Sequence, residues 1–85
     1  NHDIFHFNIK KLTGKVDINY NVDSDANVTI ILSSYSGMLY ETKHYTLKGG
    51  DTGHIYVNTS GLLPGKYVIY INVNGKVYSK TLNLA

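Results

Sequence analysis

The sequence predicts an all-β protein, an antiparallel β-sandwich of about seven strands. Apolar and polar residues alternate with a period of two along most of the chain, which is typical of half-buried strands. Turn-forming clusters interrupt this alternation at roughly the 8–12-residue spacing expected of a sandwich. No segment carries the apolar spacing of about 3.6 residues that an amphipathic helix requires.

Composition limits the chain to one small domain spanning residues 1–85. Its 42% apolar and 16% charged residues are typical of a globular protein. There is no cysteine, so neither a disulfide framework nor a thiolate metal site can contribute to stability. The hydrophobic core must therefore hold the fold together, and eight tyrosines contribute to it or to the surface.

Charge and hydropathy argue against a nucleic-acid partner and against a membrane-spanning segment. The net charge is +2, and all eight basic residues are lysine, so the arginines that read phosphate and guanine are missing. We therefore expect no nucleic-acid partner. No apolar run approaches the roughly 18 residues that span a bilayer, so we expect a protein that is not transmembrane.

Three strands are expected in the first part of the chain, at residues 3–10, 15–22 and 27–34. A polar cluster at 23–26 forms the turn between the second and the third, because short polar side chains bond the local backbone there. The inward-facing residues expected from the alternation are Phe5, Phe7 and Ile9, then Val16, Ile18, Tyr20 and Val22, then Val28, Ile30 and Leu32.

The middle of the chain is compatible with two arrangements. Residues 38–47 form either one strand or two with a bulge, since either face of this segment can pack. The glycine-rich stretch 49–53 predicts a flexible turn. Residues 54–58 then form a short strand with Ile55 and Val57 inward.

The last part of the chain predicts a β-hairpin. Residues 67–73 and 76–84 flank Asn74-Gly75, the pair that favours a type I′ turn because both central residues need positive φ. This turn places Val73 opposite Lys76 and Tyr67 opposite Leu82. Lys76 and Lys80 then share a face with core residues, which predicts that the last strand lies at a sheet edge, where lysines discourage aggregation.

The entry to this hairpin, Leu63-Pro64-Gly65-Lys66-Tyr67, resembles the corner before strand F of fibronectin type III domains. In that corner a leucine packs under the turn and the tyrosine hydroxyl bonds back to the loop backbone. The alternative is a Pro-Gly turn followed by a buried tyrosine. Both interpretations make Leu63, Pro64, Gly65 and Tyr67 structural, and the first predicts an immunoglobulin-like, fibronectin-III-like sandwich.

Residues 23–27 match the first three ligand positions of an EF-hand loop. The match then fails, because Val28 occupies the glycine position and Ser34 the position of the bidentate glutamate. We interpret the segment as an acidic turn, with a weak surface calcium site as the alternative. The four histidines, His2, His6, His44 and His54, lack metal-ligand spacing, so neither a metal nor another cofactor is expected.

Catalytic patterns are equally absent from the sequence. Glu41 is the sole glutamate, so a carboxylate pair would need aspartates that fall in turns or on solvent faces. Ser33, Ser34 and Ser36 lie outside any nucleophile-elbow context. We expect no enzymatic activity from this chain.

The number of tyrosines suggests one further hypothesis, that exposed tyrosines bind sugar rings. Exposed tyrosines on a flat sheet can stack on carbohydrate, although tyrosine-rich cores are the alternative explanation and tryptophan is missing. The candidates are Tyr35, Tyr40, Tyr45, Tyr56 and Tyr70.

From residue 18 to residue 84 the chain resembles the type A C-terminal sorting domain of the type IX secretion system of Bacteroidota. The resemblance lies in INYNV at 18–22, DANVTI at 25–30, TSGLLPGKYVI at 59–69 and NGKVYSK at 74–80. It implies a non-catalytic domain at the end of a longer secreted protein. Such a domain directs its cargo through the periplasm and outer membrane of a Gram-negative bacterium to the cell surface.

The resemblance also implies that the terminal hairpin is recognised by a protein partner in the outer-membrane secretion machinery. The residues carried over for this recognition are Gly65, Tyr67, Gly75, Lys76 and Lys80. The alternative is an Ig-like accessory domain or prodomain that contacts its parent enzyme or a surface polysaccharide.

Overall fold

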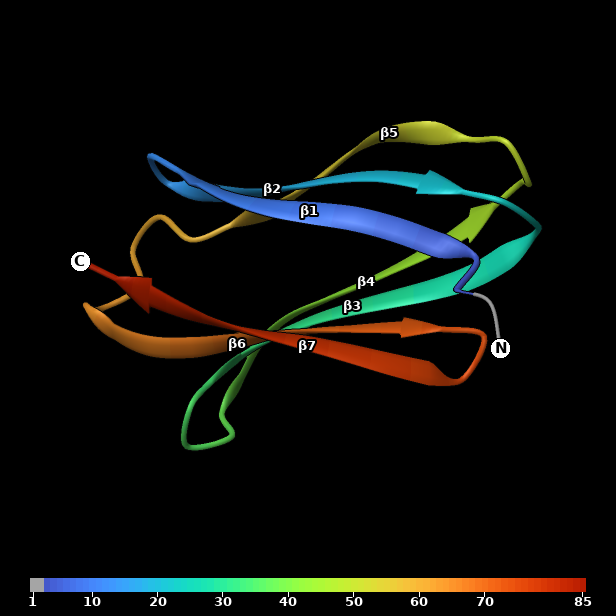
Figure 1. Cartoon of the computed structure of the whole chain (residues 1–85). Coiled ribbons are helices and arrows are strands. Elements are labelled where there is room, and N and C mark those ends of the chain that lie inside the picture. The colour runs from blue at the N-terminus through green and yellow to red at the C-terminus, as the bar shows by residue number, and fades with distance from the viewer. Residues whose placement is uncertain (1–2) are drawn as a thin grey trace. The chain divides into compact units, whose positions relative to one another are not determined.

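The computed structural model describes residues 3–85, and their regular structure is entirely β (Figure 1). The fold is therefore the predicted all-β class, with seven strands in two antiparallel sheets, as in a β-sandwich. The strands are β1 (Phe5–Leu12), β2 (Lys15–Val22), β3 (Ala26–Ser34), β4 (Leu39–Leu47), β5 (Thr52–Asn58), β6 (Gly65–Val73) and β7 (Lys76–Leu84).

Strand order separates a three-stranded sheet, β1-β2-β5, from a four-stranded sheet, β4-β3-β6-β7. β4 lies beside β3, in the sheet of β6 and β7, and this leaves β5 to pair with β2. The chain divides into two compact units that follow the sheets: residues up to Ala26 with Leu47–Leu62, and Asn27–Thr46 with Leu63–Ala85.

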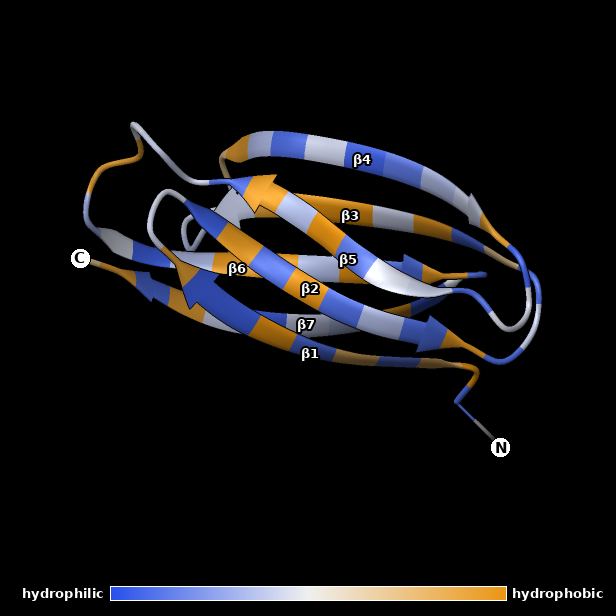
Figure 2. Cartoon of the chain, turned by 90° about the horizontal axis from the view of Figure 1, so that it is seen from above, coloured by the Kyte–Doolittle hydropathy of each residue, from blue (hydrophilic) through white to orange (hydrophobic). Residues whose placement is uncertain are grey.

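In the three-stranded sheet the burial alternates as the sequence predicts, but Phe7, Ile9 and Tyr20 are half-buried instead of buried. Figure 2 shows the matching alternation in hydropathy along β1, β2 and β5. β1 begins at Phe5 and continues to Leu12, two residues beyond the predicted end. The reason is the tight turn at Thr13-Gly14, which lets the pairing run to Leu12 opposite Lys15. The buried residues of this sheet are Phe5, Val16, Ile18, Val22, Ile55 and Val57.

In the four-stranded sheet, β3 and β6 are central and contribute most of the buried side chains. The segment 38–47, for which the sequence allowed two arrangements, is the single strand β4 from residue 39. Its less exposed face carries Glu41, Lys43 and Tyr45 and ends at the buried Leu47. The buried residues of β3 and β6 are Val28, Ile30, Leu32, Ser33, Tyr67, Val68, Ile69, Ile71 and Val73, together with Ala26.

The β6–β7 hairpin has the predicted turn and register. Asn74 and Gly75 both have positive φ, 51° and 94°, as a type I′ turn requires. Val73 pairs with Lys76 and Tyr67 with Leu82, and β7 lies at the edge of its sheet. The turn is held further by the Asn74 Oδ1 atom, which accepts a hydrogen bond from the Asn27 backbone N–H at 2.8 Å.

Tyr67 makes the contact of a tyrosine corner. Its hydroxyl donates a hydrogen bond of 2.6 Å to the Leu63 carbonyl oxygen, and the residue is only 5% exposed. Tyr40 packs edge-on against the Tyr67 ring with centroids 5.8 Å apart. The expectation that Leu63 packs beneath the turn is wrong, because its side chain is 77% exposed and it contributes a backbone carbonyl instead.

We expect Tyr67→Phe to lower the free energy of unfolding by about 1–2 kcal/mol, because it removes the hydroxyl donor from a part-buried carbonyl while keeping the ring. The measurement is urea unfolding followed by circular dichroism. Tyr70→Phe is the control, since Tyr70 lies on the exposed side of the same strand and should be neutral. Equal unfolding midpoints for the two variants would contradict a structural role for the Tyr67 hydroxyl.

Candidate functional site

The terminal hairpin brings together three of the predicted recognition residues at exposed positions. Gly75 lies in the turn, and Lys76 and Lys80 lie on β7. Gly65 is also exposed and begins β6 opposite Leu84, at the far end of the hairpin. Tyr67 is buried, so it supports the corner and offers no contact surface to a partner.

β7 is an exposed edge strand. Leu82 is its one buried residue, and Val77 is 56% exposed although it is apolar. β6 pairs with one side of β7, and no strand among the described residues pairs with the other side. An edge of this kind presents backbone N–H and C=O groups that another chain can meet.

The charge of the hairpin is uniformly positive. Residues 63–85 carry Lys66, Lys76 and Lys80 and no aspartate or glutamate. Two of these ammonium groups lie near aromatic rings: Lys66 Nζ is 4.9 Å from the Tyr35 centroid and Lys76 Nζ is 5.3 Å from the Tyr78 centroid. Such contacts order the side chains while the charge stays accessible.

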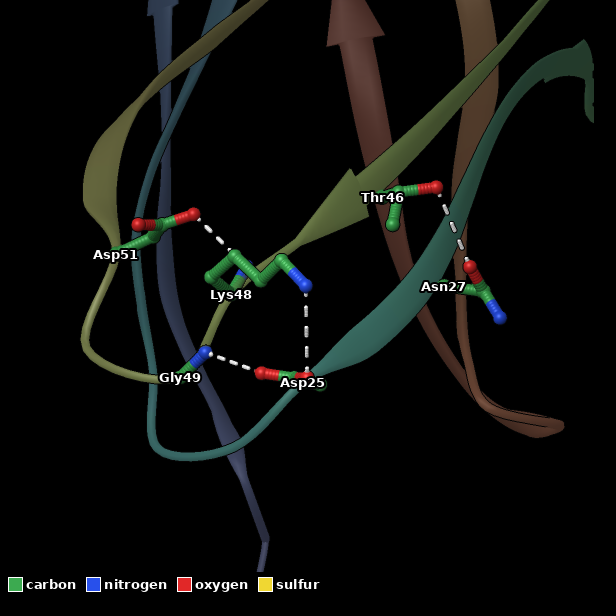
Figure 3. Close-up of polar contacts among 6 residues, drawn as sticks. All are labelled: Asp25, Asn27, Thr46, Lys48, Gly49 and Asp51. Atoms are coloured by element: carbon green, nitrogen blue, oxygen red, sulfur yellow. Dashed lines mark hydrogen bonds and ion pairs between the residues drawn. The ribbon is translucent and has the colours of Figure 1, made fainter.

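The acidic turn at 23–26 is locked to the turn between β4 and β5 (Figure 3). Asp25 accepts a hydrogen bond from the Gly49 backbone N–H at 3.0 Å, and its other oxygen is 3.9 Å from Lys48 Nζ. Asp51 accepts one from the Lys48 backbone N–H at 2.8 Å. Gly49 leaves no room for a side chain, since a Cβ there would lie 2.9 Å from Ser24 Cα.

These contacts use the carboxylates that a calcium ion would need. Asp23 pairs with His6 Nε2 at 2.7 Å, and Asp25 is engaged by Gly49. Across residues 3–85, no three histidine, cysteine, aspartate or glutamate residues are grouped as a metal site requires. His2 lies outside the described residues. The geometry therefore favours the interpretation of 23–26 as a structural turn.

Each described histidine has a partner of its own. His6 bonds Asp23, His44 Nδ1 is 3.0 Å from Thr29 Oγ1, and His54 Nδ1 is 2.9 Å from Asp17 Oδ1. The last pair joins β5 to β2, and its two residues are 37 positions apart in the sequence. The sequence does not predict this pair, because nothing local indicates which strand pairs with β5.

The tyrosines proposed for sugar stacking do not share one strand or one turn. Tyr56 lies on β5 and is 44% exposed, whereas the other four belong to the segment 35–45 and to β6. Tyr35, the most exposed at 65%, lies in a turn beneath Lys66, and Tyr40 packs on Tyr67. Tyr45 is half-buried.

The serines and the sole glutamate have local surroundings. Ser34 Oγ accepts a hydrogen bond from the Met38 backbone N–H and lies 2.9 Å from Ser36 Oγ, and Ser33 Oγ donates to the Ser34 carbonyl. These hydroxyls stabilise the turn between β3 and β4. Glu41 Oε1 is buried without a hydrogen-bond partner among residues 3–85, on the less exposed face of β4.

No family model matches the chain, and no curated protein matches it. Among solved structures it is similar to the crystal structure of a hypothetical protein, PH1083, from Pyrococcus horikoshii OT3. The two share 12% identity with a TM-score of 0.50, over 98% of this chain and 88% of that chain. At this identity the likeness is one of fold alone. Within the described residues there is also no helix with the length and hydrophobicity needed to cross a membrane.

We expect Gly49→Ala to reduce the free energy of unfolding by about 1–3 kcal/mol, because the new methyl group would force the two turns apart. Thermal unfolding measured by circular dichroism tests this. Lys48→Ala is the matched control in the same turn, because its exposed ion pair contributes well under about 1 kcal/mol. A Gly49→Ala variant as stable as Lys48→Ala would show that the turns are not tightly locked.

Proposed function

We propose that this domain is a non-catalytic C-terminal sorting and anchoring domain, which directs a secreted cargo protein through the outer membrane to the cell surface of a Gram-negative bacterium. The observation that carries the proposal is the terminal hairpin. It is an exposed sheet edge with a rigid Asn74-Gly75 turn and with Lys76 and Lys80 accessible beside it. The resemblance of residues 18–84 to type A sorting domains supplies the kind of partner.

A hairpin of this geometry suits recognition by a protein. Its register is fixed by the turn, so binding a partner requires little ordering of the hairpin backbone. The absence of acidic residues from 63–85 gives this surface one sign of charge, which accelerates encounter with an acidic partner surface. The free edge of β7 adds the option of strand-to-strand pairing.

The predicted residues then divide by role. Lys76 and Lys80 contact the partner directly, and Gly75 permits the tight turn between the strands through its φ of 94°. Tyr67 contributes indirectly, because its hydroxyl bonds the Leu63 carbonyl and so holds the start of β6 in place. Its loss would weaken recognition only as far as it loosens the hairpin.

The test is export of a reporter enzyme fused upstream of this domain in a Bacteroidota host that has the type IX system. We expect Lys76→Gln with Lys80→Gln to reduce the reporter at the cell surface at least about tenfold and to leave it in the periplasm, because two charge contacts are lost. The measurement is surface labelling with cell fractionation.

Lys10→Gln with Lys11→Gln is the control, because it removes the same charge from exposed positions on β1. It should leave export unchanged. Both variants are first compared with the parent domain by urea unfolding, so that a folding defect is recognised. Export that is equally efficient with the hairpin variant and with the control would overturn the sorting proposal.

A further inference from the structure

The outward face of the three-stranded sheet differs in chemistry from the rest of the surface. Strand pairing places Asn8, Asn19 and His54 in one row across β1, β2 and β5. His6 and Asn21 form the adjacent row on one side, and Tyr56 lies opposite Asp17 on the other side. We name this surface the polar face and define it by His6, Asn8, Asn19, Asn21, His54 and Tyr56, all of which are exposed.

The three asparagines in the middle of this face do not hold the fold through their side-chain amides. No hydrogen bond within residues 3–85 uses the side-chain amides of Asn8, Asn19 or Asn21. Asparagine is disfavoured in strands, where β-branched and aromatic residues fit the pleated surface better. Three unpartnered amides side by side on paired strands therefore lower strand propensity without an internal hydrogen bond in return.

Three other asparagines in strands provide a comparison within the same chain. Asn72 Oδ1 accepts a hydrogen bond from the Gly75 backbone N–H at 2.8 Å, and Asn58 Oδ1 accepts one from the Ser60 backbone N–H at 3.0 Å. Asn27 Oδ1 accepts one from Thr46 Oγ1 at 3.4 Å. Those residues stabilise turns or neighbouring strands. The amides of the polar face are instead available to a ligand.

A shallow, open depression of about 270 Å³ lies at these amides. It is lined by His6, Asn8, Asn19 and Asn21 together with the central pair Phe7 and Tyr20. Its volume is just below the range of roughly 300–1,000 Å³ found for small-molecule pockets, and it is open to solvent. This shape suits one unit of a chain that lies across the sheet rather than a ligand that is enclosed.

Two parallel rings stand on β5 beside these amides, His54 in the row of Asn8 and Asn19 and Tyr56 in the row of Asp17. The His54 and Tyr56 rings are stacked at 7° with centroids 6.0 Å apart. Asp17 holds the imidazole at 2.9 Å, and Lys15 Nζ lies 4.4 Å from the Tyr56 centroid. The rings are therefore ordered before any ligand arrives, and His54 is the register neighbour of Asn19.

We propose that the polar face binds a neutral oligosaccharide chain, with the amides of Asn8, Asn19 and Asn21 bonding its hydroxyls and the His54–Tyr56 rings contacting its C–H surfaces. An amide offers two donors and an acceptor, which matches hydroxyls that both donate and accept. Lys15 Nζ and the His54 ring already lie against the Tyr56 ring, so the part of that ring that stays exposed supplies apolar surface beside its polar tip. Charge supports a neutral ligand, because Lys10 and Lys15 are offset by Asp17 and Asp23 and no arginine is present.

The first experiment titrates the ¹⁵N-labelled domain with cellohexaose, laminarihexaose and mannohexaose, followed by NMR. We expect at least one of these to shift the side-chain amide signals of Asn8, Asn19 and Asn21, with a dissociation constant on the order of 1 mM or tighter. Polygalacturonate is the anionic comparison. Shifts caused by polygalacturonate alone, or by none of the four saccharides at several millimolar, would overturn the proposal.

The second experiment uses variants and the saccharide that binds best. Asn19→Thr and Tyr56→Ser each weaken binding at least about tenfold, since each removes one class of contact. Threonine favours the strand, so Asn19→Thr keeps the fold. Tyr70→Ser, at an exposed tyrosine of the four-stranded sheet, leaves affinity unchanged. Equal affinity of Asn19→Thr, Tyr56→Ser and the parent domain would contradict the assignment of this face.

Saccharide binding by the polar face does not depend on the proposed sorting function, and the variants of the two surfaces distinguish the two functions. Asn19→Thr should be exported like the parent in the reporter assay. Lys76→Gln with Lys80→Gln should bind saccharide like the parent. Loss of saccharide binding in the lysine variant, with the amide signals unperturbed by saccharide, would place the contact on the hairpin and overturn the assignment to the polar face.

Discussion

Burial of alternate side chains is the constraint on which the rest of this structure depends. The chain has 85 residues and no cysteine, so stability comes from the apolar surface that the two sheets remove from water. Because the side-chain period of a strand is two, each inward residue fixes an outward neighbour. The exposed faces are therefore set by the register of the core, and a slip of one residue would exchange them.

The register of β6 and β7 follows from the local turn and was predictable from the sequence. Asn74 and Gly75 accept positive φ at little cost, which fixes the loop at two residues and every pair beyond it. The inward residues of β2, β3 and β5 were predictable for the same reason, since alternation is a local property. β4 was not, because both of its faces mix polar and apolar residues and the choice depends on the neighbouring strands.

Features that depend on pairing between distant segments could not be predicted. The His54–Asp17 pair requires β5 to lie beside β2, and the row Asn8–Asn19–His54 exists only after three strands have aligned. Leu63 shows a different limit. A motif places a residue in a turn, but whether its side chain packs depends on what the turn faces, and here only its carbonyl is used.

The two proposed surfaces use opposite properties of a β-sheet. The hairpin offers an edge, where backbone groups and lysines meet a partner, whereas the polar face offers the flat middle of a sheet, where side chains alone make contact. The charged groups divide in the same way: the unit that contains β7 holds four lysines and one glutamate, and the unit that contains the polar face holds four lysines and five aspartates.

A positive edge suits a protein partner with acidic groups, and a nearly neutral face rich in amides suits a ligand made of hydroxyls. A small domain without disulfides has little stability to spare, so the low-propensity side chains at Asn8, Asn19 and Asn21 are consistent with the proposed role in binding a ligand.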